Sequence, residues 1–577
     1  MTDALVDLHE TFPMRFVPAG ADATDWTVIE RLGAALLGRA CATPAELERW
    51  LEDVGELAGW VLEEGSRREI AMMLHTDDPE ARRAHLEWIR NIRTPWERLE
   101  HRLIDTYLAS PQRGALSDRY RVFDRAAEAQ HALYHEANGP LIVREAEQAQ
   151  TYQKRIGAMT IVYEGHEYTR QQAFAFLESP DRAVRKTVWS LLTERALAER
   201  DALDALFDDL RSLRTRIAHN AGFGSYREYA FVARKRFDYG PEECARFGEA
   251  VEAHFVPLAT RIANERSGLM GLARLRPWDD RANPLGQEPP AGPRGPDELL
   301  DRCEDVLRRI APDFGACARL LRSGRLLDLE RRKGKAPGSW WIALPAKRQV
   351  FILLNASASR EVRALFHEFG HAVHYLLARH DPLLAYRTAP EEFNEVASQG
   401  MELLAAPHFG LVYDRPEDAR RAYRQLLDHI VVTMPWVATI DAFQHWIYAH
   451  PDHTVAERQA AWVQVYRRFH PNWLDWQGHE AVLASLWHFQ PHVFLEPFYY
   501  IEYGFAYLGA LQLWRRATEG DPAGAVAAYR AALSLGGSRP LPELFEAAGL
   551  RFGFDVEAMA PVAAALAHAL DDMPYRA

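Results

Sequence analysis

Apolar residues recur at steps of three and four positions through most of the chain, with charged residues between them. This spacing is typical of amphipathic helices, because about 3.6 residues complete one helical turn. It is clearest in four segments: 43–64, 118–137, 191–218 and 240–268. Thr43 and Glu46 have the spacing of a capping box, which indicates that a helix begins there. The pattern therefore predicts a mostly α protein.

Strand patterns are confined mainly to one region. Two short apolar runs, LLDLERR at 326–332 and RQVFILLN at 348–355, flank the Gly- and Pro-rich segment GKAPGSWW at 334–341. Apolar runs on both sides of a turn are typical of paired strands, so we expect a small β-sheet directly before residues 366–377. Residues 276–297 contain six prolines and no apolar period, which predicts a long surface connection.

The length and composition exclude some classes of protein. At 577 residues the chain exceeds what one hydrophobic core usually spans, so we expect two lobes. Hydrophobic residues make up 48% and charged residues 26%, and the net charge is −13. With this charge and no long basic tract, the chain lacks the positive surface that nucleic acids and anionic membranes require. We therefore expect neither of them as a partner.

We expect neither a secretory signal nor a membrane-spanning segment. The start, MTDALVDLHETFPMRF, has early acidic residues and no apolar core of a secretory signal. No run approaches the roughly 20 apolar residues that cross a bilayer. The scattered cysteines form no C-x-x-C pair, which favours free thiols over disulfides or metal ligands: Cys41, Cys244, Cys303 and Cys317. We expect a cytoplasmic protein.

Residues 366–377, FHEFGHAVHYLL, contain the pattern that carries most of the chemistry. On a helix, His367 and His371 lie one turn apart on one face, and Glu368 lies one step round. Two neutral imidazoles suit Zn²⁺, and the carboxylate suits proton transfer at a water on that ion. Gly370 costs a helix about 1 kcal/mol, which is tolerated where another backbone approaches closely. A polar helix face rich in histidine is the alternative interpretation.

A catalytic zinc needs a third protein ligand. The H-E-x-x-H-x-x-G-x-x-H pattern fails, because residue 374 is His and residue 377 is Leu. The segment PEEFNEVASQGMELL, at 390–404, predicts a second helix with one apolar and one acidic stripe. Within it, Asn394, Glu395 and Ser398 have the N-E-x-x-S spacing of a glutamate-type zincin, so we expect Glu395 as the third ligand. Glu392 or Glu402 is expected to orient a ligand imidazole. His374 is assigned to the substrate side, with ordinary packing as the alternative.

The motifs together resemble those of the M3 metallopeptidases, in particular the oligoendopeptidase F branch. The matching segments are GFGSYREYAFVARKRFDYGPEE (222–243), GKAPGSWW (334–341), HEFGHAVH (367–374), FNEVASQGMELL (393–404) and HVFLEPFYYIEYGFAYLG (492–509). The resemblance covers most of residues 190–577. One departure is Ala397, where the family usually has proline, and another is the paired tryptophan after Gly338 and Ser339. Neither departure removes a ligand.

This resemblance implies a fold, a cofactor and roles for individual residues. It implies two helical lobes around a deep substrate channel, and we divide the chain into a helical lobe at 1–190 and a catalytic region at 191–577. It also implies one Zn²⁺ per chain, with these roles: His367, His371 and Glu395 as ligands, Glu368 as catalytic base, and His492, Tyr499 and Tyr503 as stabilisers of the tetrahedral oxyanion. An aromatic core stripe is the alternative for the tyrosines. Tyr500, in the same aromatic region, is expected to contact substrate. Gly338 is also expected to contact substrate, because glycine allows close backbone approach beside the sheet.

The resulting expectation is a zinc-dependent oligoendopeptidase that hydrolyses internal bonds of short unfolded peptides by zinc-activated water, with a glutamate as general base. Three alternatives stay open: a zinc carboxypeptidase or dipeptidyl carboxypeptidase on a similar scaffold, a catalytically silent peptide-binding protein, and a helical scaffold without zinc. The sequence leaves open the physiological substrate, the cleavage-site preference, the oligomeric state and the metal used in the cell.

Overall fold

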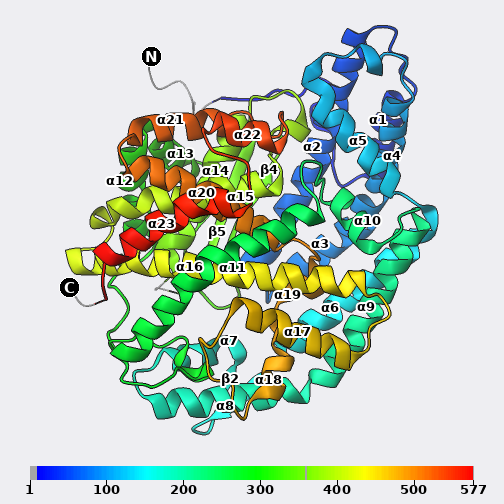
Figure 1. Ribbon diagram of the computed structural model, residues 1–577. Coiled ribbons are helices and arrows are strands. Elements are labelled where there is room, and N and C mark those ends of the chain that lie inside the picture. The colour runs from blue at the N-terminus through cyan, green and yellow to red at the C-terminus, as the bar shows by residue number, and fades with distance from the viewer. Residues whose placement is uncertain (1–9, 358–359, 576–577) are drawn as a thin grey trace. The chain divides into compact units, whose positions relative to one another are not determined.

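The computed structural model describes residues 10–357 and 360–575 and is mostly α-helical, as predicted (Figure 1). By its internal contacts the chain forms two compact units. Unit 1 comprises residues 10–132, 290–423 and 506–552, and unit 2 comprises residues 133–289, 424–505 and 553–575. Each unit is thus assembled from three stretches of sequence, and two long helices run from one unit into the other. The boundary near residue 190 stays a prediction.

Unit 1 contains helices from the beginning, middle and end of the chain and a three-stranded sheet. Its elements are α1 (Trp26–Leu37), α2 (Pro44–Leu74), α3 (Pro79–Trp88), α4 (Thr94–Leu108), α5 (Arg121–Leu133), α12 (Pro296–Ile310), α13 (Pro312–Ser323), β3 (Leu327–Asp328), β4 (Gly338–Leu344), β5 (Gln349–Asn355), α14 (Glu361–Ala378), α15 (Glu391–Ala405), α21 (Pro522–Leu533) and α22 (Leu541–Ala547). Helix α2 begins with the predicted capping box, since Thr43 and Glu46 exchange side-chain and backbone hydrogen bonds.

Unit 2 is built from helices and one hairpin. Its elements are α6 (Gly139–Gly157), β1 (Thr160–Tyr163), β2 (His166–Thr169), α7 (Arg170–Ala173), α8 (Arg182–Ala198), α9 (Arg200–Asn220), α10 (Tyr226–Ala233), α11 (Pro241–Leu269), α17 (Val455–Phe469), α18 (Glu480–Ala484), α19 (Pro491–Leu495) and α23 (Val556–Asp572). Helices α16 (Pro416–Ala449) and α20 (Ile501–Thr518) belong to both units.

Two sequence expectations about unit 2 need correction. The hairpin β1–β2 was missed, although Glu164 and Gly165 form its turn with φ of 50° and 79°, the backbone that a tight hairpin requires. The segment 276–297 was expected on the surface, but Trp278 and Asp279 are buried. The Asp279 carboxylate accepts hydrogen bonds from Arg182 and Arg185, and these bonds anchor the start of the connection in the interior.

The predicted sheet lies against the histidine helix of unit 1. Its strand order is β3–β5–β4, so β5 is central, parallel to β3 and antiparallel to β4. The residues from Val350 to Leu354 are all buried, as expected for a central strand covered on both faces. Both β4 and β5 pack on α14, and α14 packs in turn along α15. The sheet and the two helices therefore form the core that positions the candidate site.

Helix α16 meets the length and composition of a membrane span, with a window of mean hydropathy 1.3. Within that window, 67% of the residues are buried inside the protein. Burial of this extent is what a core helix shows, and one such helix is weak support for a membrane protein.

Helices α14 and α15 touch most closely at Gly370. A Cβ atom on this residue would lie 2.4 Å from the backbone oxygen of Ala397 and 2.5 Å from the Cα of Ser398. Both distances are far shorter than van der Waals contact, and backbone atoms cannot rotate away. The glycine that weakens the helix is therefore what allows the two helices to approach.

We expect the substitution Gly370→Ala to lower the free energy of unfolding by about 1–3 kcal/mol, because it forces the two helix backbones apart. Urea denaturation monitored by circular dichroism measures this change. The matched control is Gly268→Ala in helix α11, where an added Cβ meets nothing within 4 Å. That control is expected to be neutral or stabilising by up to about 1 kcal/mol. Equal effects of the two substitutions would contradict the close-approach argument.

Candidate metal centre and catalytic residues

The three predicted metal ligands come together on α14 and α15. Ligand atoms of His367, His371 and Glu395 all lie within 4.8 Å of one another. The Nε2 atom of His367 is 3.3 Å from Nε2 of His371 and 3.5 Å from Oε2 of Glu395. His371 and Glu395 are buried, and His367 is partly exposed. Two imidazoles and one carboxylate from two adjoining helices are a donor set that suits Zn²⁺ with one position left open.

Glu402 orients the first of these imidazoles. Its Oε1 atom is 2.7 Å from Nδ1 of His367, and its Oε2 atom is 3.2 Å from Nε of Arg363. The carboxylate holds the imidazole proton on Nδ1, which leaves the Nε2 lone pair directed toward His371 and Glu395. The structure thus gives Glu402 the orienting contact that the sequence left open between Glu392 and Glu402. Glu392 is buried in the first turn of α15, outside the group of three donors.

Strand β4 supports the second imidazole. The ring of Trp341 stacks on the ring of His371, with centroids 5.3 Å apart and planes 23° from parallel. The second tryptophan of the pair at 340–341 therefore restrains a predicted ligand, a contact that residue spacing alone did not reveal. Its neighbour Trp340 points the other way along the alternating strand and is half exposed.

The electrostatics of the site favour a cation beside His367. Burial by itself lowers the pKa of this imidazole, but the hydrogen bond to Glu402 and the carboxylates of Glu395 and Glu368 outweigh burial and raise the pKa to about 9. Burial and the neighbouring imidazoles instead lower the pKa of His371 well below its ordinary value, so this ring stays neutral. The carboxylates around the two imidazoles give the site an excess of negative charge, which a divalent cation would balance in place of the proton on His367.

Glu368 follows His367 on α14 and is buried. Burial is the main cause that raises the pKa of its carboxyl to about 7, and the charges of Glu395 and Glu402 act in the same direction. The charge of His367 and a hydrogen bond from Ser339 on β4 lower the pKa in part. A carboxyl group whose pKa lies near neutrality can both accept and return a proton at physiological pH.

Two predicted substrate contacts of unit 1 have different surroundings. His374 is 2% exposed, its ring meets Phe393 edge-on, and burial lowers its pKa to about 4. The structure therefore places His374 in the core, apart from the group of three donors. Gly338 is exposed at the start of β4, with φ of 97°, and pairs with Asn355 of β5. Among the strands described, β4 has a partner on one side only, so its other edge carries unpaired backbone groups.

In unit 2, the predicted oxyanion residues form one aromatic cluster. The ring of His492 lies 5.7 Å from the ring of Tyr499, 4.8 Å from Tyr500 and 5.9 Å from Tyr503. Burial, and then the nearby Arg234, lower the pKa of His492 to about 4, so its imidazole is neutral at physiological pH. Burial raises the pKa of Tyr500 to about 12, which keeps its hydroxyl protonated. His492 and Tyr500 are therefore both neutral at physiological pH.

A short relay determines which nitrogen of His492 carries the proton. Nε1–H of Trp436 donates to Oε1 of Gln490 at 3.0 Å, and Nε2 of Gln490 lies 2.7 Å from Nδ1 of His492. The indole can only donate, so the amide of Gln490 must turn its NH₂ group toward the imidazole. Nδ1 of His492 then accepts, and the proton resides on Nε2. The sequence did not identify Trp436 or Gln490, which no motif marks.

Comparisons with known proteins agree with this geometry. The model of peptidase family M3 matches residues 175–284 and 316–560, more than half of the chain. No curated protein matches the chain.

Solved structures resemble nearly the whole chain. A 3.1 Å X-ray structure of a protein assigned as oligoendopeptidase F matches with a TM-score of 0.88 and 28% identity, over 98% of this chain and 100% of that chain. The structure of PZ peptidase A with inhibitor 2 matches with a TM-score of 0.88 and 25% identity, over the same shares of 98% and 100%. A protein assigned as oligoendopeptidase F from Bacillus anthracis str. Ames has the same fold, with a TM-score of 0.83 and 23% identity, over 97% and 99%.

The family match, the structural neighbours and the metal-binding donor set of α14 and α15 support one assignment. The family uses a metal cofactor and acts on peptides. The chain belongs to peptidase family M3, in its oligoendopeptidase F branch, and is a metallo-endopeptidase.

Proposed function

We propose that this protein is a zinc-dependent oligoendopeptidase that hydrolyses internal bonds of short unfolded peptides. The observation that carries the proposal is the convergence of His367, His371 and Glu395 within 4.8 Å, with the buried Glu368 on the same helix. A protein that only binds peptides has no use for a buried carboxyl group next to the ligands. For this reason a catalytic role fits the site better than a silent peptide-binding role.

The three ligands would hold one zinc ion per chain and leave a position open for water or substrate. When bound, zinc supplies Lewis acidity and lowers the pKa of a water molecule. Glu368 accepts the proton that the nucleophilic water loses and returns it to the nitrogen of the leaving amine. Its raised pKa supports both transfers, since the protonated and ionised forms are close in free energy near neutral pH. Glu402 keeps His367 in the tautomer that binds metal.

His492, Tyr499 and Tyr503 are proposed to stabilise the oxyanion of the tetrahedral intermediate. The relay through Trp436 and Gln490 supports this role for His492, because it leaves an Nε2–H donor on a neutral ring. A donor oriented before the reaction costs no reorganisation when negative charge develops. Tyr500, whose ring meets that of His492 edge-on, is proposed to contact the substrate.

The free edge of β4 is proposed to bind the peptide as an added strand. Hydrogen bonds along a strand edge read the peptide backbone, so they tolerate many side-chain sequences. Gly338 at the strand start lacks the side chain that would block approach there. Family resemblance supports a deep channel that admits short unfolded peptides and excludes folded proteins. We also propose a cytoplasmic location.

The first test compares the wild type with Glu368→Gln on an internally quenched peptide of about ten residues. Removing the base is expected to lower kcat by about 10²–10⁴-fold, while zinc content stays unchanged because Glu368 is not a ligand. Equal rates would place the chemistry elsewhere. Absence of cleavage by both zinc-loaded proteins would favour a silent peptide-binding protein.

Mass spectrometry of the products separates the enzyme classes in the same experiment. Complementary internal fragments are expected from an endopeptidase. Stepwise loss of one or two residues from the C-terminus would instead indicate a carboxypeptidase or dipeptidyl carboxypeptidase.

The second test is Glu402→Gln, which weakens the carboxylate contact to Nδ1 of His367. Loss of an orienting carboxylate is expected to raise the Kd for zinc by about 10–100-fold. Competition with a chromophoric chelator measures this Kd. The control is Glu417→Gln, an exposed residue in the first turn of α16, for which no change in Kd is expected. Identical zinc affinities would contradict the orienting role of Glu402.

The third test is His492→Phe, which keeps an aromatic ring and removes the Nε2–H donor. We expect kcat to fall about 10²–10³-fold with little change in KM, because the interaction forms with the developing oxyanion and not with the ground-state peptide. The matched control is His166→Phe, an exposed histidine in β2. A rise in KM at unchanged kcat would mean that His492 binds substrate instead.

A further inference from the structure

Three side chains of unit 2 form a second group with metal-binding donors. Cys244 lies in the first turn of α11, and Asp441 and His445 lie one turn apart on α16. The Sγ atom, a carboxylate oxygen and an imidazole nitrogen all lie within 4.8 Å of one another. The sequence predicted no such site, because its cysteines have no ligand spacing, and the proposed catalytic chemistry uses none of these three residues.

The group contains buried polar atoms that the protein does not satisfy. Cys244 is 2% exposed and Asp441 is 3% exposed. Within the described residues, Oδ1 of Asp441 and Nε2 of His445 have no hydrogen-bond partner. The contact between these two side chains is long, with 3.5 Å between Oδ2 of Asp441 and Nε2 of His445. Unpartnered buried atoms destabilise a folded protein, so their convergence on one point indicates a ligand.

The charge balance of the surroundings also favours a cation. Arg227 and Arg236 both act electrostatically on His445, and Nη2 of Arg236 donates to Oε1 of Glu502 at 2.9 Å and to the backbone oxygen of Phe498. The charge of Arg236 is therefore balanced by Glu502.

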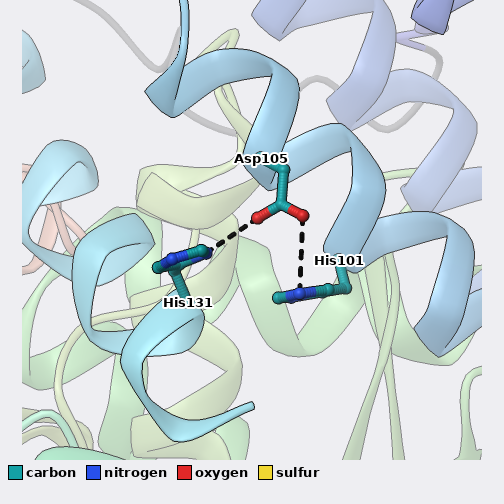
Figure 2. Close-up of side chains that lie close together, drawn as sticks. All are labelled: His101, Asp105 and His131. Atoms are coloured by element: carbon teal, nitrogen blue, oxygen red, sulfur yellow. Dashed lines mark hydrogen bonds and ion pairs between the residues drawn. The ribbon is translucent and has the colours of Figure 1, made fainter. Parts of the chain in front are cut away.

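A second group of histidine and aspartate side chains, in unit 1, differs from this one because its polar atoms have partners or contact water. Figure 2 shows His101 and Asp105 of α4 and His131 of α5, with the carboxylate between the two rings. Oδ1 of Asp105 lies 2.8 Å from Nδ1 of His131, and Oδ2 of Asp105 lies 3.5 Å from Nε2 of His101. The side chains of Asp105 and His131 are both substantially exposed. The two carboxylate oxygens face one imidazole each and are also accessible to water. This cluster is explained without a metal, whereas the buried group of unit 2 is not.

We propose that Cys244, Asp441 and His445 bind a second divalent metal ion, zinc by preference, in a structural site that joins α11 to α16. A thiolate, an imidazole and a carboxylate suit zinc, and a water completes four-coordination. Binding forms a metal–sulfur bond and releases the thiol proton to solvent. The position of Cys244 at a helix N-terminus favours the thiolate. The side chain of His445 is 16% exposed, so an ion can enter from its side. The proposal is independent of the catalytic function.

Cobalt substitution of the full-length protein tests this site directly. Metal-stripped protein is reloaded with Co²⁺, and the near-ultraviolet absorption is recorded. A thiolate bound to Co²⁺ gives an intense charge-transfer band, and the ligands His367, His371 and Glu395 contain no sulfur. We expect the band in the wild type and its loss in Cys244→Ser. The matched control is Cys303→Ser, another fully buried cysteine, which is expected to keep the band.

Two further measurements keep the test independent of misfolding and of the catalytic site. The double variant His367→Ala/His371→Ala removes the first site and is expected to retain about one metal ion per chain together with the band. His445→Gln is expected to raise the Co²⁺ Kd at least about tenfold at an unchanged circular dichroism spectrum. The proposal is overturned if the wild type shows no charge-transfer band, if the band survives Cys244→Ser, or if the double variant binds no metal.

Discussion

The contact between α14 and α15 at Gly370 is the constraint on which the rest of the site depends. A catalytic metal needs ligands from more than one turn of helix, and here they come from two helices whose backbones nearly touch. The carbonyl oxygen of Ala397 occupies the space that any larger residue at 370 would fill. The buried hydroxyl of Tyr529 donates a hydrogen bond to the same carbonyl oxygen, which further restrains α15. Because of this approach, Glu395 reaches the two histidines of α14.

The electrostatic consequence of this packing is a buried cluster of carboxylates around the imidazoles. Glu368, Glu395 and Glu402 are all nearly inaccessible to water, and burying three such groups together is costly unless a cation is present. Arg363 balances part of this charge at Glu402, and the raised pKa of His367 reflects the negative charge of Glu402, Glu395 and Glu368. Two of these carboxylates, Glu395 and Glu402, also contribute to the raised pKa of Glu368.

The supporting contacts show how each reactive group is oriented by a neighbour that does no chemistry. Trp341 stacks on His371, Glu402 fixes the tautomer of His367, and Gln490 fixes that of His492. Gln490 caps the helix that contains His492 and lies two residues before it in sequence. Trp341 and Glu402 instead sit on a different element from the histidine that each contacts, so tertiary packing directs these two rings. The buried group around Cys244 follows the same rule, because its donors come from helices about 200 residues apart in sequence.

The sequence by itself determined the features that follow from helical and strand periods. The spacing of His367, Glu368 and His371 places two imidazoles and a carboxylate on adjoining faces of one helix, and the N-E-x-x-S pattern at 394–398 indicated Glu395 as the third donor. The mostly α fold, the start of α2 and the small sheet before α14 follow from equally local patterns. A local motif could also have revealed the hairpin at 160–169, since Glu164 and Gly165 form its tight turn.

Only the tertiary structure decided the contacts between elements that are remote in sequence. It brought Glu402 to His367, placed His374 in the core, and brought Trp341, Trp436 and the Cys244 group to their partners. It also assembled each compact unit from three separate stretches of chain. The physical reason is that periodicity specifies which face of an element is polar or apolar, whereas the partner of that face depends on long-range packing, which no local pattern encodes.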